Sequence, residues 1–103
     1  MKTFNYHLAK DIKEAKKLSS PNSTFLAGGM TTIPSMKLGL GTYKDVIDIK
    51  GIKKISGIKS SGKILKIGST TTHAEVAKSK EVKKSIPSLA ALAEGIGDPQ
   101  VRN

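Results

Sequence analysis

The chain has 103 residues, no cysteine, two histidines and a formal net charge of +10 at neutral pH. This length suits one small domain or a piece of a larger protein, and without cysteine the chain holds no disulfide, thiolate metal site or iron–sulfur cluster of its own. It carries no apolar signal segment and no run of membrane-spanning length, so we expect a cytoplasmic protein without a membrane partner or a metal site.

The first part of the chain predicts an extended segment, a helix and a strand. Residues 4–7 form the extended segment. Asp11 and Glu14 have the spacing of a helix capping box, and apolar residues then recur at helical spacing up to Leu18. Serine, proline and asparagine end this helix, and residues 24–27 read as the strand that follows.

A glycine pair, Gly28 and Gly29, connects this strand to the next helix. Glycines let the backbone turn sharply and approach a ligand closely, and the first N–H groups of a helix have no intrahelical partner. With the helix dipole, these groups favour an anion such as phosphate. Thr31 or Thr32 either caps the helix or donates its hydroxyl to a phosphate, and Pro34 suits a first helical turn. The segment predicts an anion cradle; the alternative is a connection without a ligand, because short glycine motifs are common.

The middle of the chain predicts a helix followed by three strands. Ile33, Met36 and Leu40 fall on one face of the helix, and Gly39 and Gly41 end it. β-Branched content favours strands in the segments that follow. The expected strands are 45–49 and an antiparallel hairpin of 55–59 and 63–69, with Ser60-Ser61-Gly62 as its turn.

A second strand–hydroxyl–helix junction follows at residues 68–75. Thr72 and Glu75 have capping-box spacing, which gives Thr72 a structural role at the start of a helix. Thr70 and Thr71 are not needed for that cap. We therefore treat these two hydroxyls as candidate ligand contacts.

The last third predicts two further helices and an extended end. Ser79 caps a short lysine-rich helix, and a proline opens the next helix at residues 88–94. Leu89 and Leu92 are expected to face a core. Glycine, aspartate and proline then break the helix, and residues 100–103 are expected to be extended.

Taken in order, these motifs resemble the N-terminal part of the FAD-binding medium subunit of molybdenum hydroxylases, a family that includes aerobic carbon monoxide dehydrogenases and xanthine dehydrogenases. The resemblance spans essentially the whole chain, and its final octet is the most specific match. One departure is Met30-Thr31, where typical members have Thr-Asp or His-Ser after the two glycines. The matching segments are Leu26-Ala27-Gly28-Gly29 with Pro34 and Met36-Lys37, Val46-Ile47-Asp48-Ile49, Ile67-Gly68, Thr71-Thr72-His73-Ala74-Glu75, and Ile96-Gly97-Asp98-Pro99-Gln100-Val101-Arg102-Asn103.

The resemblance implies a fold and a place in a larger protein. Family members hold FAD between two α/β subdomains, and two glycine loops contact it. Residues 1–103 correspond to the first FAD-binding subdomain and stop before the second glycine loop and the second subdomain. With the alternation of strand and helix signals, this predicts an α/β (α+β) fold whose core sheet is mainly parallel, with one hairpin.

The resemblance also implies a cofactor, partners and binding residues. FAD passes electrons from iron–sulfur clusters to an external acceptor, so the expected partners are an iron–sulfur subunit, a molybdopterin subunit and the rest of the flavin subunit. The redox chemistry belongs to the flavin, so no catalytic residue is expected, and the isolated chain is expected to be inactive. The implied FAD-binding positions are Phe25, Leu26, Ala27, Gly28, Gly29, Met30, Thr31, Thr32, Ile33, Ile96 and Gly97.

Two other interpretations are compatible with the sequence. The positive charge suggests a small basic protein that binds nucleic acid or an acidic partner. However, Arg102 is the only arginine, the lysines are scattered, and an aromatic content of 4% gives no base-stacking platform. We therefore expect any nucleic-acid binding to be weak and without sequence specificity, whereas some lysines could face an acidic partner or a phosphate-bearing ligand. The other interpretation is a remnant of a flavin domain that no longer binds.

Overall fold

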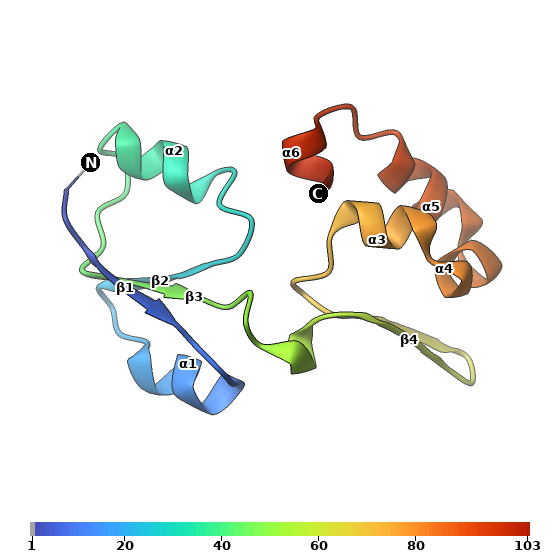
Figure 1. The fold of residues 1–103 in the computed structure, drawn as a ribbon, viewed down its shortest axis with the longest axis horizontal. Coiled ribbons are helices and arrows are strands. Elements are labelled where there is room, and N and C mark those ends of the chain that lie inside the picture. Colours follow the sequence, from blue (N-terminus) through green and yellow to red (C-terminus); the bar gives the residue numbers. More distant parts are fainter. Residues whose placement is uncertain (1) are drawn as a thin grey trace. The chain divides into compact units, whose positions relative to one another are not determined.

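The computed structural model describes residues 2–103, which form two compact units. The first unit extends to Lys54, and the second runs from Ile55 to Asn103. Figure 1 shows the elements of both, and each unit is described by itself. None of the helices in residues 2–103 combines the length and the apolar composition that a bilayer crossing requires.

The first unit is built on a parallel sheet of three strands, β1 (Asn5–Leu8), β2 (Ser23–Leu26) and β3 (Asp45–Asp48). The last strand in the sequence lies in the middle, so the order is β1-β3-β2. In register, Leu8 and Leu26 both lie opposite Asp48. The carboxyl ends of the three strands therefore share one edge of the sheet.

Helices cover both faces of this sheet. The chain crosses from β1 to β2 through α1 (Ile12–Leu18) and returns to β3 through α2 (Thr32–Lys37). Because the two crossings run in opposite directions across the sheet, right-handed connections place the two helices on opposite faces. Figure 1 shows α1 and α2 on the two sides of the strands. The buried Val46 and Ile47 of the central strand face these two layers.

The end of α2 differs from the expected helix. Leu40 lies beyond the helix and is 79% exposed, so the prediction that it shares an apolar helix face with Met36 is wrong. Gly39, with φ +74°, reverses the chain. Its N–H bonds to the carbonyl of Met36 at 3.2 Å, and the Leu40 N–H bonds to that of Ser35 at 2.9 Å. These two bonds form a Schellman cap, which satisfies the last carbonyls of the helix.

The second unit begins with an antiparallel hairpin. Its strands are β4 (Ile58–Ser61) and β5 (Ile64–Ile67). The predicted pairing is confirmed, but the turn lies at Gly62 and Lys63 rather than at residues 60–62. Gly62 has φ +59°, which suits the first central position of a two-residue hairpin turn and is unfavourable for other residues. Ile55 belongs to a short 3-10 helix, η1 (Lys53–Ile55), not to the strand.

Four helices complete the second unit: α3 (His73–Lys78), α4 (Lys80–Ser85), α5 (Pro87–Glu94) and α6 (Pro99–Arg102). The predicted caps are present, since Thr72 and Glu75 form a capping box and the Ser79 hydroxyl accepts the Val82 N–H at 3.2 Å. The buried core consists of Val76, Val82, Ala90 and Ala93, against which Ile58, Leu65, Ala77 and Leu89 pack. The expected combination of a mainly parallel sheet and one hairpin is confirmed.

Two predictions for the last part of the chain are wrong. Leu92 is 73% exposed, because α5 turns its small side chains, Ala90 and Ala93, toward the core. Residues 100–103 do not continue as an extended segment. Asp98 accepts the N–H of Gln100 at 2.9 Å and caps α6, in which Pro99 occupies a first-turn position where its missing N–H costs nothing.

Candidate functional site

The glycine pair lies at the carboxyl edge of the parallel sheet. Strand β2 ends at Leu26, and residues 27–31 lead from it to α2. In open α/β sheets, ligands bind outside the carboxyl ends of the strands, where connections leave toward opposite faces. The connections after β1 and β2 do so here. The loop that the sequence predicted as an anion cradle therefore lies at the edge of the sheet where proteins of this architecture bind ligands.

Gly29 is required by the backbone itself. Its φ of +74° lies in the left-handed region that side chains other than glycine rarely adopt. A Cβ atom at this position would lie 2.7 Å from Cδ1 of Ile33 and 3.3 Å from Cδ1 of Leu26. The fold thus accounts for glycine here without a ligand.

Gly28 has no such explanation within the fold. Its φ is outside the left-handed region, and a Cβ atom built on it would have no neighbour within 4 Å. The residue is exposed, so the space beside its backbone is open. A glycine in this setting lets a ligand approach the main chain closely, and this open face is the feature that fits a cofactor phosphate.

The backbone donors of the loop are free. In residues 2–103, no hydrogen bond is made by the N–H groups of Gly28, Gly29, Met30 or Thr31. Two of the loop carbonyls do have partners, since Gly29 accepts the Ile33 N–H at 3.0 Å and Thr31 accepts the Ser35 N–H at 3.1 Å. Successive N–H groups without partners can gather around an anion when the chain turns. Because α2 has six residues, any attraction of an anion would come from these loop donors more than from a helix dipole.

The threonines after the glycine pair do not cap the helix. Thr31 occupies the N-cap position, but its side chain makes no capping hydrogen bond. Its backbone is already in the right-handed helical region, with φ −107° and ψ −45°, whereas a capping residue is usually extended. The cap proposed for Thr31 or Thr32 is therefore absent. The Thr31 side chain is exposed, and that of Thr32 is half-buried.

The second junction, by contrast, uses its hydroxyls internally. Thr71 Oγ1 accepts the Gly57 N–H at 3.0 Å and donates to the Gly57 carbonyl at 3.1 Å. Thr70 Oγ1 donates to the Ile55 carbonyl at 2.9 Å. The interpretation of Thr70 and Thr71 as ligand contacts is wrong, because both tie the chain after β5 to the chain before β4.

The same junction also needs its glycine for packing. A Cβ atom on Gly68 would lie 2.4 Å from the carbonyl oxygen of Ile55 and 2.7 Å from the nitrogen of Ser56. Both are backbone atoms, which cannot swing aside. Gly68 is thus a structural glycine, unlike Gly28.

Two side-chain pairs between β1 and β3 were missed by the sequence reasoning. The Tyr6 hydroxyl donates to Asp48, a carboxylate that is only 4% exposed and that also accepts the Lys50 N–H at 2.9 Å. This hydrogen bond raises the pKa of Tyr6. His7 Nε2 lies 2.9 Å from Asp45 Oδ1, and this contact, with a hydrogen bond from Asn5, lowers the pKa of Asp45. The sequence signal for these pairs is the alternation of side chains along a strand. Because adjacent residues such as Tyr6 and His7 face opposite sides of the sheet, each meets a different aspartate of β3.

Two of the predicted FAD-binding positions, Ile96 and Gly97, lie in the second unit. Ile96 is half-buried, and its carbonyl accepts a hydrogen bond from the Arg102 guanidinium at 2.8 Å. Gly97 is exposed, and a Cβ atom there would have no neighbour within 4 Å. The structure thus gives Ile96 a local role as an acceptor and leaves the surroundings of Gly97 open.

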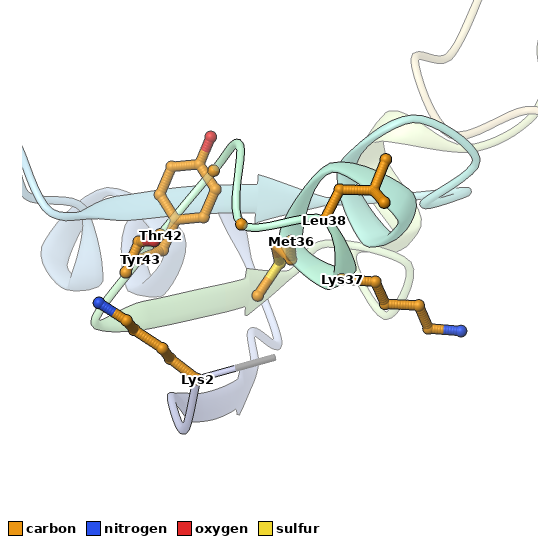
Figure 2. Close-up of a pocket in the computed structure, with 8 residues that line it drawn as sticks. Lys2, Met36, Lys37, Leu38, Thr42 and Tyr43 are labelled. Carbon is orange, nitrogen blue, oxygen red and sulfur yellow. The ribbon is translucent and has the colours of Figure 1, made fainter.

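A hollow of about 400 Å³ lies elsewhere in the first unit (Figure 2). Its lining includes Lys2 and Tyr43, which precede β1 and β3, so it lies toward the amino ends of the strands, away from the glycine pair. In Figure 2 the Lys37 side chain extends away from Tyr43. The hollow is therefore distinct from the candidate loop. Its lining residues are Lys2, Met36, Lys37, Leu38, Gly39, Gly41, Thr42 and Tyr43.

Comparison with known proteins identifies relatives over nearly the whole chain. Residues 2–103 match the family model described as the FAD binding domain in molybdopterin dehydrogenase. The carbon monoxide dehydrogenase medium chain of Hydrogenophaga pseudoflava is 37% identical over 103 residues, which cover 97% of this chain and 36% of that one. The xanthine dehydrogenase FAD-binding subunit of Escherichia coli O157:H7 is 29% identical over 102 residues, covering 96% and 35%.

Solved structures give the same result. A structure of carbon monoxide dehydrogenase from Hydrogenophaga pseudoflava superposes with a TM-score of 0.91 at 37% identity, covering 97% of this chain and 36% of that chain. This chain therefore spans about a third of the length of the relatives it matches. With a family model that matches residues 2–103, the chain belongs to the family of FAD-binding domains of molybdopterin dehydrogenases.

Proposed function

We propose that this chain is part of the FAD-binding subunit of a multi-subunit molybdenum-containing oxidoreductase, and that residues 27–31 contact the FAD pyrophosphate. Family membership supports the cofactor. The observation that carries the site is the set of free N–H groups in residues 28–31 beside the open face of Gly28. A phosphate is the ligand group that such a set of donors favours.

The chemistry of the loop suits the binding of a phosphate by main-chain atoms. Hydrogen bonds to a charged group contribute about 1.5–3 kcal/mol each, and ordering of the ligand offsets part of that. Met30, which replaces a polar residue of typical members, keeps its N–H and presents an exposed apolar side chain. We therefore propose that backbone groups, not the side chain at this position, hold the pyrophosphate. The proposed contacts in the first unit are Phe25, Leu26, Ala27, Gly28, Gly29, Met30, Thr31, Thr32 and Ile33.

The role of the chain is to bind and orient the cofactor. When bound, FAD supplies the electron-transfer chemistry, and we propose no catalytic residue in this chain. Proposed contacts from Ile96 and Gly97 rest on the family resemblance. The proposed partners are an iron–sulfur subunit, a molybdopterin subunit and the rest of the flavin subunit, and we propose a cytoplasmic location for the assembly.

The isolated chain should bind FAD weakly. In the family architecture a second subdomain and a second glycine loop enclose the flavin, so residues 1–103 alone would leave the ring largely in water. We expect this chain to purify colourless and the complete flavin subunit to purify with stoichiometric FAD. Flavin absorbance measures both, and a stoichiometric yellow complex of the short chain would contradict the proposed division of the site.

Substitution of Gly28 in the complete subunit tests the loop. Gly28→Val should reduce FAD affinity at least tenfold, because the side chain would fill the open space beside the backbone donors. Gly29 is a poorer target, since any side chain there also strains the backbone. Gly39→Asn is the matched control, because Gly39 lies at the other end of α2, has no neighbour within 4 Å of its Cβ position, and asparagine is tolerated in this cap.

The outcomes separate folding from binding. Both variants should melt within a few degrees of the parent subunit, and only Gly28→Val should lose flavin. If Gly28→Val retains full FAD occupancy at unchanged affinity, the pyrophosphate does not lie against this loop and the proposed site is wrong.

A further inference from the structure

The central strand of the parallel sheet ends in a buried carboxylate. In residues 2–103, Asp48 is the only polar or charged residue that is buried. A carboxylate inside a protein is unfavourable unless its oxygens find hydrogen-bond partners. Both oxygens of Asp48 have one, since Oδ1 accepts the Lys50 N–H at 2.9 Å and Oδ2 accepts the Tyr6 hydroxyl. The role of this residue therefore follows from what these bonds hold in place.

The main chain at the end of β3 joins the ends of all three strands. The Asp48 carbonyl accepts the Ala9 N–H at 3.0 Å, just after β1. The next residue, Ile49, donates its N–H to the Leu26 carbonyl at 2.9 Å, at the end of β2. The loop with the free N–H groups begins directly after Leu26, at Ala27. The turn that follows β3 thus holds the residue from which this loop starts.

The Asp48 side chain sets the shape of that turn. An aspartate oxygen that accepts the N–H two residues later forms an Asx turn, which fixes the backbone between the two partners. The bond from the Lys50 N–H to Asp48 is of this kind. Ile49 lies between the two, so the direction in which its N–H points depends on the turn. A change in the Asp48 side chain would therefore reach the start of the loop through Ile49.

Asp48 is not suited to contact a phosphate itself. Both of its oxygens already accept a hydrogen bond, and its side chain is only 5% exposed. Its negative charge would also repel an anion, although the Lys50 ammonium, 3.8 Å from Oδ2, offsets part of that charge. An influence of Asp48 on a ligand would thus pass through the backbone.

Stabilisation of the sheet is the simpler explanation, and a second aspartate of β3 provides the comparison for it. Asp45 also joins β1 to β3, because its Oδ1 lies 2.9 Å from Nε2 of His7. This pair lies at the amino ends of the strands, whereas Asp48 lies at the carboxyl edge beside the loop. If the two aspartates served stability alone, their positions relative to the loop would make no difference to a ligand.

We propose that Asp48 is a positioning residue for FAD. Through the turn of residues 48–50 it fixes the end of β2, and it thereby keeps the N–H groups of residues 28–31 arranged for the pyrophosphate. The inference rests on the proposed function, because it takes FAD as the ligand of this loop. A loop that is ordered before binding loses less freedom on binding, which raises affinity. Fixing the backbone of one residue corresponds to about a tenfold change in a binding constant.

Matched valine variants of the complete flavin subunit test the proposal by titration of the FAD-free protein with FAD. Asp48→Val removes both side-chain hydrogen bonds but leaves a β-branched apolar residue in the buried strand position, so the subunit should still fold. At a temperature where the parent and the variants are folded, Asp48→Val should bind FAD about tenfold more weakly. Asp45→Val makes the same change at the other end of β3 and should keep the parent affinity.

A conservative variant identifies the bond that matters. Asp48→Asn keeps an oxygen for the Lys50 N–H, and asparagine forms the same turn, so this variant should recover most of the FAD affinity. Parent affinity in Asp48→Val, or an equal loss in Asp48→Val and Asp45→Val, would overturn the proposal. Either result would show that the loop does not depend on this turn in particular.

Hydrogen exchange of the unaltered subunit provides a measurement that needs no variant. If the turn supports FAD binding, FAD must in return stabilise the turn, because coupling between two sites is reciprocal. Saturation with FAD should therefore slow exchange of the Ile49 amide more than that of the Asn5 amide, which bonds to the Lys44 carbonyl at the amino ends of the strands. Equal slowing of the two amides would contradict the proposed coupling.

Gly28→Val distinguishes this inference from the function on which it rests. If Gly28→Val keeps full FAD affinity, the loop is not the FAD site, and the proposed function and this inference are both wrong. If Gly28→Val loses FAD while Asp48→Val binds it as the parent does, the proposed function stands and only the role of Asp48 is overturned. Loss of affinity in both variants, with Asp45→Val unchanged, is the expected result.

Discussion

The two halves of the molecule contain junctions that look alike in sequence and differ in what they do. Each has a strand, a glycine, a cluster of threonines and a helix. After β2, the loop leaves its N–H groups without partners and leaves the space beside Gly28 open. After β5, Thr70 and Thr71 bond to the backbone of the preceding segment, and Gly68 is packed against Ile55.

The difference separates a loop whose hydrogen-bonding groups are still available to a ligand from one of similar composition whose groups are already used within the fold. A hydroxyl that already donates to the main chain of its own domain cannot also donate to a ligand, such as a phosphate, without loss of that bond. N–H groups without partners on an exposed loop can receive a ligand at no such cost. The decisive property is the state of the hydrogen-bonding groups, which the residue types alone do not reveal.

The largest expected effect is a difference in stability between substitutions of Gly68 and Gly28. Gly68→Ala should destabilise the second unit by about 3 kcal/mol, because the new Cβ would overlap the Ile55 carbonyl, which lies 2.4 Å from its position. Gly28→Ala should change stability by less than about 0.5 kcal/mol, since its Cβ meets nothing. Urea unfolding of both variants in the same protein measures the contrast, and equal destabilisation would mean that Gly28 is also a packing glycine.

The hydroxyls should show a smaller contrast. Thr71→Val removes both hydrogen bonds to Gly57 and leaves the Gly57 N–H without a partner. This should lower the free energy of unfolding by about 1–2 kcal/mol. Thr31→Val should leave stability unchanged within about 0.5 kcal/mol, because its side chain makes no capping bond. The measurement is again the free energy of unfolding. A larger loss at Thr31 than at Thr71 would reverse the assignment of the two junctions.

The smallest expected effect is a pH dependence confined to the first unit. The pKa of Tyr6 is raised by its hydrogen bond to Asp48, so the native state holds the phenol proton more tightly than the unfolded chain does. This stabilisation is fully present below the ordinary tyrosine pKa of about 10 and is lost as the pH rises through the raised value. The free energies of unfolding of the parent protein and of Tyr6→Phe, measured across the pH range, should therefore converge at strongly alkaline pH.

A spectroscopic control isolates the same proton. Tyr43→Phe leaves Tyr6 as the single tyrosine, whose ionisation can be followed by tyrosinate absorbance. In this background Asp48→Asn should bring the midpoint back toward the ordinary value. An unchanged midpoint would show that the Tyr6–Asp48 contact does not govern the titration.

Local signals predicted the parts of the fold that depend on neighbouring residues. The cap at Thr72 and Glu75, the cap at Ser79 and the strand before Ile49 all follow from short spacings, and the structure contains them. The glycine loop was located by the same reasoning, because a strand, two glycines and a helix start are adjacent in the chain. The family resemblance added the cofactor, which composition could not supply.

The failures have identifiable physical causes. Leu92 satisfied the helical period, but the face of α5 that packs is decided by its neighbours, and alanines allow a closer approach. Asp98-Pro99 was interpreted as a helix breaker, although the same pair is also a cap followed by a first-turn proline. The roles of Thr70 and Thr71 depended on partners about fifteen residues earlier, which only the hairpin brings near.

The strand order also governs when the loop can acquire its shape. In the described part of the chain, strands β1 and β2 pair only with β3, the last of the three in sequence, so neither has a sheet partner until residues 45–48 are in place. Bringing Asn5 beside Asp45 closes a long stretch of chain, whereas β4 and β5 are joined by a two-residue turn. Contacts between distant residues form more slowly than local ones. The hairpin should therefore form early on refolding, and the loop of residues 27–31 should be among the last segments to become ordered.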